Sequence, residues 1–246
     1  MTTYSYTELR EETREKLKKI STATLATCLF KRGLRGQAIQ NVRPLNSSLG
    51  VMVGQAFTLR YIPAREDLNT LEAFRDPHHL QRRAVEDCPP GMVLVMDSRK
   101  DPSAASAGGI LVTRMFRRGL AGVVTDGGFR DAVDIGGLDF PAYHSRPSAP
   151  TNLTKHHAIA LQEPIGCGDA PVFPGDVIVG DGDGVMVIPL ALADEIAEEA
   201  TQMTLFEDFV MEEVDKGRAV IGLYPPTQER SLADFESWKA AKGTAG

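Results

Sequence analysis

Cysteine is scarce in this chain of 246 residues, and the three that occur are far apart. Cys28, Cys88 and Cys167 form neither a CxxC pair nor the Cys/His spacing of a zinc site, so a structural zinc is not expected. Three separated thiols are most simply explained as free thiols in a reducing compartment. The sequence therefore predicts a cytoplasmic protein with free cysteines.

The chain also lacks any apolar run long enough to cross a membrane, and its first twenty residues are too charged for a secretory signal. Acidic residues outnumber basic ones, 33 to 27, which gives a formal net charge of −6. The basic residues are scattered, whereas a nucleic-acid surface needs them clustered. We therefore expect a soluble protein with no membrane or nucleic-acid partner, whose ligand is a small molecule.

Three motifs that mark common enzyme classes are missing: the G-x-S-x-G elbow of hydrolases, the Walker A loop and the dinucleotide fingerprint. Gly119 and Gly122 resemble part of a dinucleotide turn, but they precede the apolar residues of a strand instead of following them. A nicotinamide cofactor is therefore not expected.

Helical and strand patterns alternate along the chain, with no internal repeat and no linker. The alternation predicts an α/β fold with one domain over residues 1–246, including an N-terminal helix at about 7–20 and a C-terminal extension at about 223–246. Trp238 is expected to pack on the chain's own core or on a neighbouring subunit. The remaining expected elements are a helix over 21–32, strands over 50–62 and 92–96, a hairpin over 177–188 with a DGDG turn, a long helix over 193–216 and a short helix over 231–241.

Residues 108–131 form the most informative stretch. A glycine pair opens a helix whose apolar residues recur at helical spacing, and a further glycine ends it. After a short apolar strand, Gly127 and Gly128 are expected to adopt positive φ in a turn. That turn delivers Arg130 and Asp131 side by side.

These elements together suit the binding of a 2-oxo acid. The first backbone N–H groups of the helix are free and lie at its positive end, so they can bind an anion. Arg130 offers a planar two-pronged donor for a carboxylate, and Asp131 offers a hard oxygen ligand for Mg²⁺ or Mn²⁺. The alternative is that Arg130 and Asp131 form an ordinary solvated pair on a surface loop.

Three further residues are candidates for proton transfer. Asp97 follows the buried strand at 92–96, and a polar residue at the carboxyl end of such a strand is well placed for a site. Asp97 and its charged neighbours either line the cleft or pair with one another at the surface. Glu66 and His78 lie in the charge-rich segment 65–83, which is otherwise expected to be a solvated helix and loop.

The run over 108–131, the PGD turn at 174–176 and the DGDGVMVIP run at 181–189 together resemble the ribonuclease-activity-regulator A (RraA) family. The metal-dependent members of that family are the 4-hydroxy-4-methyl-2-oxoglutarate/4-carboxy-4-hydroxy-2-oxoadipate aldolases. The similarity extends over about residues 20–225. It implies a swivelling β/β/α fold, assembly as a homotrimer or a dimer of trimers, and a site between subunits.

The resemblance also implies roles for individual residues. Arg130 and the backbone at the helix start would bind the pyruvyl oxygens of the substrate, and Asp131 would hold a divalent metal largely through water. The helix start consists of Gly108, Gly109, Ile110 and Leu111. The implied activity is that of a class II, metal-dependent lyase, which cleaves a 4-hydroxy-2-oxo acid or decarboxylates oxaloacetate.

The chemistry of the residues is consistent with this activity. Either reaction leaves a pyruvate enolate, whose negative charge would be stabilised by Arg130 and by Mg²⁺ or Mn²⁺ on the 2-oxo group. No lysine lies within 108–131 to form a Schiff base, which favours the metal route over the covalent one.

Three positions depart from the aldolase pattern. Gly109, Thr27 and Arg218 stand where the aldolases carry acids. The half of the site that binds pyruvate and metal is thus retained, and proton transfer would pass to one of the three candidates named above. The alternative function is that of a non-catalytic relative that binds and inhibits a ribonuclease; retention of Arg130 and Asp131 favours the enzyme.

Overall fold

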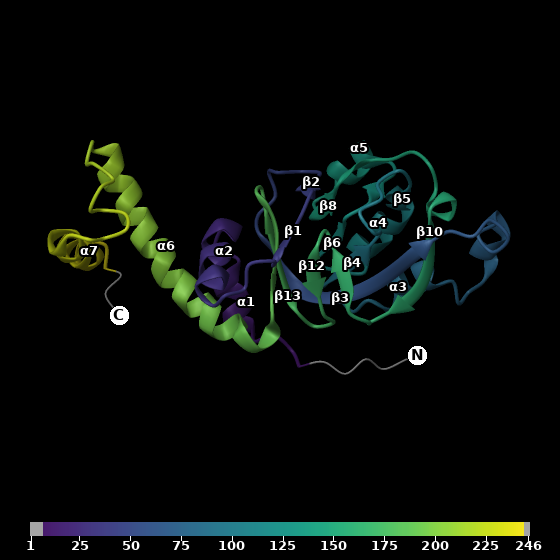
Figure 1. Cartoon of the computed structure of the whole chain (residues 1–246), viewed down its shortest axis with the longest axis horizontal. Coiled ribbons are helices and arrows are strands. Elements are labelled where there is room, and N and C mark those ends of the chain that lie inside the picture. The colour runs from purple at the N-terminus through teal and green to yellow at the C-terminus, as the bar shows by residue number, and fades with distance from the viewer. Residues whose placement is uncertain (1–6, 244–246) are drawn as a thin grey trace.

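The computed structural model describes residues 7–243 and has a mixed α/β architecture, with helices near both ends of the chain (Figure 1). Eight strands of its main sheet follow the order β1-β14-β13-β3-β4-β6-β8-β2, and a ninth, β10, pairs with the second half of β3. The strands of this sheet span Ala38–Ile39 (β1), Arg43–Pro44 (β2), Met52–Pro63 (β3), Met92–Asp97 (β4), Gly122–Thr125 (β6), Ala142–His144 (β8), His156–Leu161 (β10), Val177–Asp181 (β13) and Gly184–Ile188 (β14).

The centre of the sheet consists of β3, β4, β6 and β8, which run parallel to one another. Every residue of β4 is buried, and successive side chains enter opposite layers: Leu94 packs in one hydrophobic cluster, Val93 and Val95 in another. A strand buried on both faces has a continuous apolar sequence. The continuous apolar sequence at 92–96 therefore predicted a strand, and the structure confirms that strand as β4.

Different elements cover the two faces of the sheet. Helices α3 (Leu80–Asp87) and α4 (Gly109–Arg117) pack against one face, and the small hairpin of β11 (Ile165–Cys167) and β12 (Ala170–Val172) covers the other. Helices α3 and α4 hold the elements of the candidate site near the carboxyl ends of the parallel strands β3, β4, β6 and β8.

The hairpin predicted over 177–188 is confirmed as β13 and β14. Its turn residue Asp181 accepts hydrogen bonds from the backbone N–H and the hydroxyl of Thr22, each at 2.7 Å. Thr22 is the first residue of α2 (Thr22–Lys31), so this aspartate anchors the start of a helix.

The N-terminal helix is shorter than predicted. It spans only Glu11–Leu17 (α1) instead of residues 7–20. The side-chain amide of Gln55 explains the difference, because its oxygen accepts the N–H of Leu9 and its nitrogen donates to the carbonyl of Thr7, both at 2.8 Å. These bonds hold the first described residues extended along β3, an effect of tertiary contact that helical spacing does not reveal.

The long helix predicted over 193–216 is α6 (Ala193–Asp215), preceded by a 3₁₀ turn, η3 (Leu190–Leu192). Its first half packs on α1 and α2, and its second half extends away from the body (Figure 1). There α7 (Glu229–Ala241) folds back onto it, and we call residues 206–243 the arm. Trp238 packs on Phe209 and Phe235 within the arm, so the only tryptophan contacts its own chain.

A second, three-stranded parallel sheet extends the main one and carries the candidate site. Its strands are β5 (Ala105–Ala107), β7 (Gly128–Phe129) and β9 (Arg146–Pro147). Short helical segments complete the fold: η1 (Leu71–Arg75), α5 (Ala132–Gly136) and η2 (Asn152–Thr154). Within residues 7–243, no helix has the length and apolar character that a membrane span requires.

Candidate active site

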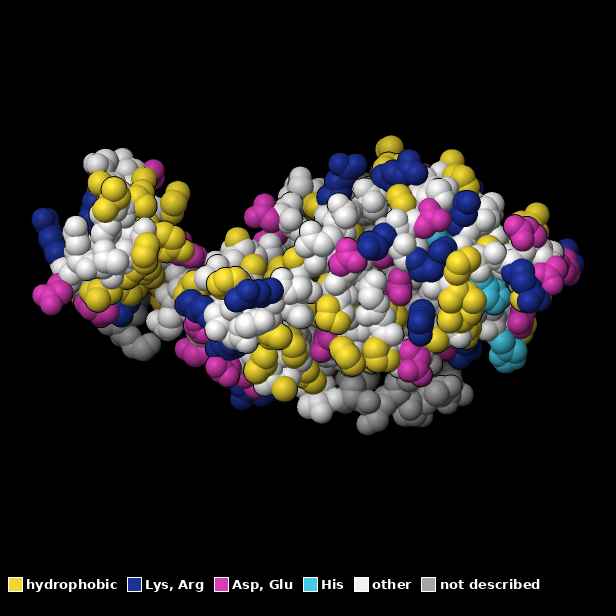
Figure 2. Space-filling model, viewed as in Figure 1, with side chains coloured by type: hydrophobic (Ala, Val, Ile, Leu, Met, Phe, Trp, Pro, Cys, Tyr) yellow, Lys and Arg dark blue, Asp and Glu magenta, His cyan; other side chains and the backbone are white. Residues whose placement is uncertain are grey.

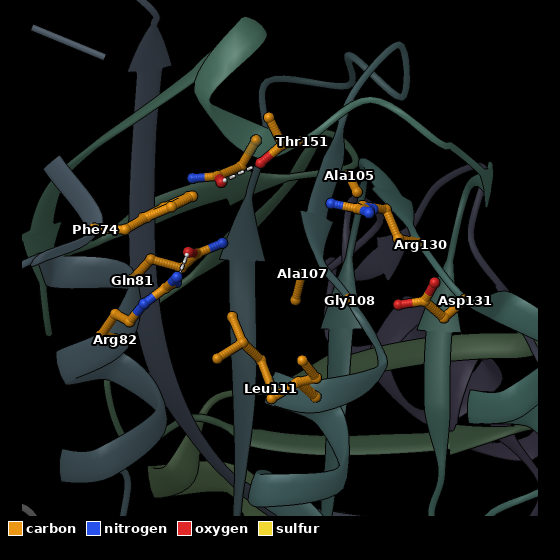
Figure 3. A pocket seen from close by; sticks show the side chains of 12 residues that line it. Phe74, Gln81, Arg82, Ala105, Ala107, Gly108, Leu111, Arg130, Asp131 and Thr151 are labelled. Carbon is orange, nitrogen blue, oxygen red and sulfur yellow. Dashed lines mark hydrogen bonds between the residues drawn. The ribbon is translucent and has the colours of Figure 1, made fainter. Parts of the chain in front are cut away.

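The candidate site is a pocket of about 200 Å³ beside the second sheet, where β5 leads into α4 and β7 leads into Arg130 and Asp131 (Figure 3). Strands of the main sheet end nearby, and ligand sites of α/β proteins lie typically at such carboxyl ends. The pocket is lined by Phe74, Gln81, Arg82, Ala105, Ala107, Gly108, Ile110, Leu111, Arg130, Asp131, Thr151 and Asn152.

Asp131 adopts the left-handed conformation, with φ 56° and ψ 38°. Aspartate tolerates this region better than most residues with a side chain. In the resulting arrangement, Oδ2 of Asp131 accepts a hydrogen bond from the backbone N–H of Gly109 at 2.9 Å. The predicted convergence of the helix start with Asp131 is therefore present in the structure.

The prediction of positive φ at Gly127 and Gly128 was wrong. Between residues 122 and 131, positive φ occurs at Asp131 instead. The two glycines are required for space: a Cβ on Gly127 would lie 2.5 Å from the hydroxyl oxygen of Ser106, and one on Gly128 would lie 2.6 Å from Cβ of Ser148. The residues that crowd them come from strands and loops distant in sequence, so the local pattern cannot reveal the requirement.

The glycine pair at the helix start allows Asp131 to approach closely. A Cβ on Gly108 would lie 3.1 Å from Oδ2 of Asp131, and one on Gly109 would lie 3.2 Å from its Cβ. Gly109 is also the position where an acid was expected from the family resemblance. A side chain there would press on Asp131, and a second carboxylate would repel it.

Arg130 has a backbone that is fixed and a side chain that is free. Its N–H donates to the carbonyl of Ala107 at 3.0 Å. Its guanidinium makes no hydrogen bond or ion pair with any residue in 7–243, Asp131 included. Figure 3 shows this side chain at the edge of the pocket, above Gly108. Arg130 and Asp131 therefore do not pair with each other, and both side chains are exposed.

Asp97 lies at the end of β4, as predicted, but does not line the pocket. It is only 9% exposed, and its Oδ1 accepts the N–H of Arg99 at 2.8 Å. The neighbouring Asp126 accepts the N–H groups of Ser98, Lys100 and Gly168, and burial raises the pKa of its carboxyl group. Both aspartates thus hold the loop behind the site in place.

The other two candidates for proton transfer are also outside the pocket. Glu66 and His78 are exposed on the segment between β3 and α3. The N–H of His78 donates to Asp76, a bond that organises a turn. The structure does not bring Asp97, Glu66 or His78 to Arg130.

The pocket wall opposite Arg130 contains residues that sequence analysis did not identify. Phe74, Gln81 and Arg82 come from the segment expected to be solvated, and Figure 3 shows them across the pocket from Arg130. No local signal separates Arg82 from its neighbour Arg83, since both are arginines on a charged helix. Only the packing of α3 against β3 and β10 decides which one enters the pocket.

Thr27 and Arg218, which stand where acids were expected, lie outside the pocket of their own chain. Thr27 is on α2, and its hydroxyl donates to the carbonyl of Ala23. Arg218 belongs to the arm and pairs with Glu213 and Asp234. In Figure 1 the arm lies at the far left and α2 lies between the arm and the main sheet, whereas α3 lies to the right.

Comparison with known proteins identifies two groups of relatives: proteins named as aldolases and proteins named as RraA. A protein of Halalkalibacterium halodurans named "Putative 4-hydroxy-4-methyl-2-oxoglutarate aldolase" is 33% identical over 179 residues, which cover 72% of this chain and 79% of that protein. The structure of Streptomyces coelicolor RraAS2, described as an unusual member of the RNase ES inhibitor RraA family, matches with a TM-score of 0.73. That match has 28% identity and covers 83% of this chain and 98% of RraAS2.

A further solved structure, an uncharacterised protein of Pseudomonas syringae, matches with a TM-score of 0.74 at 22% identity. It covers 87% of this chain and 98% of its own and supports the fold alone. The family model Aldolase/RraA matches residues 22–187, which include the main sheet up to but not including the last residue of β14 and all of the pocket. The predicted RraA-like α/β fold is confirmed, and this chain belongs to the Aldolase/RraA family.

Proposed function

We propose that this protein is a divalent-metal-dependent lyase acting on small 2-oxo acids. The reaction would be decarboxylation of oxaloacetate, retro-aldol cleavage of a 4-hydroxy-2-oxo acid, or both. The observation that carries the proposal is the free guanidinium of Arg130 beside Asp131, whose carboxylate meets the start of α4. The unpaired guanidinium of Arg130 and the free backbone N–H groups suit the carboxylate of a ligand. The carboxylate of Asp131 suits a metal ion.

The residues present fit Mg²⁺ or Mn²⁺ better than zinc. Within the described part of the chain, no group of three or more His, Cys, Asp or Glu side chains is placed to hold an ion. Zinc sites usually need three or four such ligands, whereas Mg²⁺ keeps several waters and is often held by one or two carboxylates. Asp131 would hold the ion, and one of its oxygens remains available because only Oδ2 accepts the N–H of Gly109. When bound, the ion would supply Lewis-acid stabilisation of the charge that develops on the 2-oxo group.

The chain's own residues would bind and orient the pyruvyl end of the substrate. Arg130 would bind the carboxylate and stabilise the negative charge of the enolate as it forms. The N–H groups of Ile110 and Leu111 have no helical acceptor, since α4 begins at Gly109, and they would hold a second oxygen. The N–H of Gly109 is already occupied by Asp131 and would position the metal ligand instead.

The residues that line the pocket of a single chain favour decarboxylation over retro-aldol cleavage. Its charged lining residues are Arg82, Arg130 and Asp131, so apart from the proposed metal ligand it contains no acid or base. Retro-aldol cleavage needs a base to accept the proton of the 4-hydroxyl group. Loss of CO₂ from oxaloacetate needs only stabilisation of the enolate. If the protein cleaves an aldol substrate, we expect a neighbouring subunit to supply the base.

Pyruvate release from oxaloacetate, measured with and without EDTA, tests the proposal. We expect turnover in Mg²⁺ or Mn²⁺ that is lost in excess chelator and restored by adding the metal. Turnover that persists in chelator would contradict the metal requirement, and absence of turnover with either metal would contradict the enzyme.

The second candidate function is inhibition of a ribonuclease. It is favoured by the likeness to RraAS2, which is described as a member of an RNase ES inhibitor family. Such a role needs a protein-binding surface and makes no demand on Arg130. Absence of metal-dependent turnover, together with binding to a ribonuclease, would favour this alternative.

A further inference from the structure

We infer that residues 65–78, which connect β3 to α3, form a flap that closes over the pocket when a ligand binds there. Phe74 is the residue through which the bound ligand contacts the flap and holds it closed. The inference rests on the proposed function, since it assumes that the pyruvyl end of the ligand binds at Arg130.

The flap projects from the body of the protein. Figure 1 shows the segment between β3 and α3 beyond β10, at the far right of the view. Each of residues 65–78 is exposed or only partly buried, and none of them belongs to a hydrophobic cluster. A segment without buried apolar contacts can change its position at a low cost in free energy.

The polar contacts of the flap are local. Within the described part of the chain, its hydrogen bonds and ion pairs join residues of the flap to one another, except that the carbonyl of Asp76 accepts the N–H of His79 at 3.1 Å. At the other end, the N–H of Ala64 donates to the carbonyl of Lys155 at 3.0 Å. The flap is therefore fixed at its two ends, and no hydrogen bond between them has to break when it moves.

Phe74 connects the flap to the pocket. Its ring centre lies 4.0 Å from the guanidinium of Arg82 on α3 and 5.3 Å from the ring centre of His79, which precedes α3. The same side chain lines the pocket, and Figure 3 shows it across the pocket from Arg130. A ligand can shift the position of a segment only by binding one of its states more tightly. Contact between the ligand and the Phe74 ring supplies that difference in affinity.

Exposed apolar side chains on the flap and on the pocket lining favour closure. Leu71 of the flap is 77% exposed, and Ile110, which lines the pocket, is 87% exposed. Removing apolar side chains of this size from water is favourable. A flap that covers the pocket shields both from water. It also excludes water from Arg130, which strengthens the interaction of its guanidinium with the charge of a bound ligand.

Hydrogen exchange measured by mass spectrometry, with two matched ligands, tests the inference. 2-Oxopentanoate and pyruvate share the end that would bind Arg130, but only 2-oxopentanoate has a propyl chain that extends toward Phe74. Both are added with Mg²⁺ at concentrations that saturate binding in calorimetric titration. With 2-oxopentanoate, the amides of residues 65–78 should exchange about fivefold more slowly, as expected when a flap that is open half of the time becomes open one-tenth of the time. Pyruvate should slow their exchange less.

Three variants make the test specific. Phe74→Ala removes the ring and should lose the additional protection that 2-oxopentanoate gives to residues 65–78, whereas Phe74→Tyr keeps the ring and should retain it. Phe173→Ala is the matched control, because Phe173 is also an exposed phenylalanine but lies outside the pocket, and it should keep the wild-type protection. Circular dichroism would confirm that the variants fold, and the comparison of the two ligands on the wild type needs no variant.

The flap is overturned if 2-oxopentanoate leaves the exchange of residues 65–78 unchanged, or if neither ligand binds. It is also overturned if pyruvate protects these residues equally, or if folded Phe74→Ala keeps the full protection, because the Phe74 ring would then not couple the ligand to the flap. Failure of the proposed function is a separate result, which appears as absent metal-dependent turnover of oxaloacetate by the wild type. Unchanged exchange with turnover intact would contradict the flap alone.

Discussion

At the scale of single residues, the site depends on two neighbours with different structural states. Arg130 has a free side chain, whereas Asp131 is held in the left-handed conformation by its bond to the helix start. The first is available to bind a ligand without breaking a protein contact. The second is already oriented, so little reorganisation would be needed to bind the proposed metal ion.

The first prediction concerns Arg130→Lys, which keeps the charge but loses the planar two-donor geometry. If Arg130 stabilises the enolate, kcat for oxaloacetate decarboxylation should fall by roughly 10²–10³-fold. Steady-state kinetics would measure the change. Arg117→Lys, at the far end of α4, is the control and should keep the wild-type rate. Equal kcat values for Arg130→Lys and the wild type would contradict the assigned role.

The second prediction concerns Asp131→Asn. Asparagine tolerates positive φ and still offers an oxygen to the N–H of Gly109, so the fold should be retained. The charge that attracts the metal is lost, and metal-dependent turnover should fall on the order of 10²-fold or more. Rates measured over a range of Mg²⁺ concentrations would show it. Asp139→Asn, an exposed aspartate outside the pocket, is the control, and a similar effect in both variants would refute Asp131 as the metal ligand.

At the scale of elements, the site is built where three parallel strands of the main sheet continue into the second sheet. β4, β6 and β8 are followed by β5, β7 and β9, and the junctions carry buried polar side chains. The hydroxyls of Ser106 and Thr125 lie 2.7 Å apart there, and that of Ser98 lies 2.6 Å from Ser106. This packing leaves no room for side chains at the glycines of the junction.

The third prediction follows from that packing. Gly127→Ala would place a Cβ 2.5 Å from the Ser106 hydroxyl and 2.7 Å from Cβ of Ser98, so the free energy of unfolding should fall by roughly 1–3 kcal/mol. Urea denaturation would measure the loss, and turnover should fall with it because β7 positions Arg130. Gly182→Ala is the control, since a Cβ there meets nothing within 4 Å. Equal urea midpoints for Gly127→Ala and Gly182→Ala would contradict this prediction. They would show that the residues around Gly127 can move to accommodate the added methyl group.

At the scale of the whole molecule, the arm leaves the body and carries its own hydrophobic cluster. Figure 2 shows hydrophobic side chains gathered on the arm, at the far left of the view. Several large apolar residues of this region are exposed, among them Met211, Val220 and Ile221, the last of which is 89% exposed. Exposed apolar surface of this kind is typical of a region that contacts another subunit.

The fourth prediction is that the protein is a homo-oligomer, either a homotrimer or a dimer of trimers. The reasons are the exposed apolar residues of the arm and the absence of a proton-transfer group from the pocket of a single chain. Multi-angle light scattering at micromolar concentration would give the mass. A monomeric mass would contradict the prediction, and the base for any retro-aldol reaction would then have to come from the same chain.

Local patterns alone determined much of this protein. The buried strand at 92–96, the hairpin over 177–188 and the helix that begins after Gly108 were all predicted, because periodicity, turn residues and helix ends are encoded by near neighbours. The tertiary structure decided the rest. It assigned positive φ to Asp131, kept Asp97 out of the pocket, and placed Arg82 instead of Arg83 opposite Arg130. Each of these depends on contacts between segments distant in sequence, and such contacts leave no periodic signal in the chain.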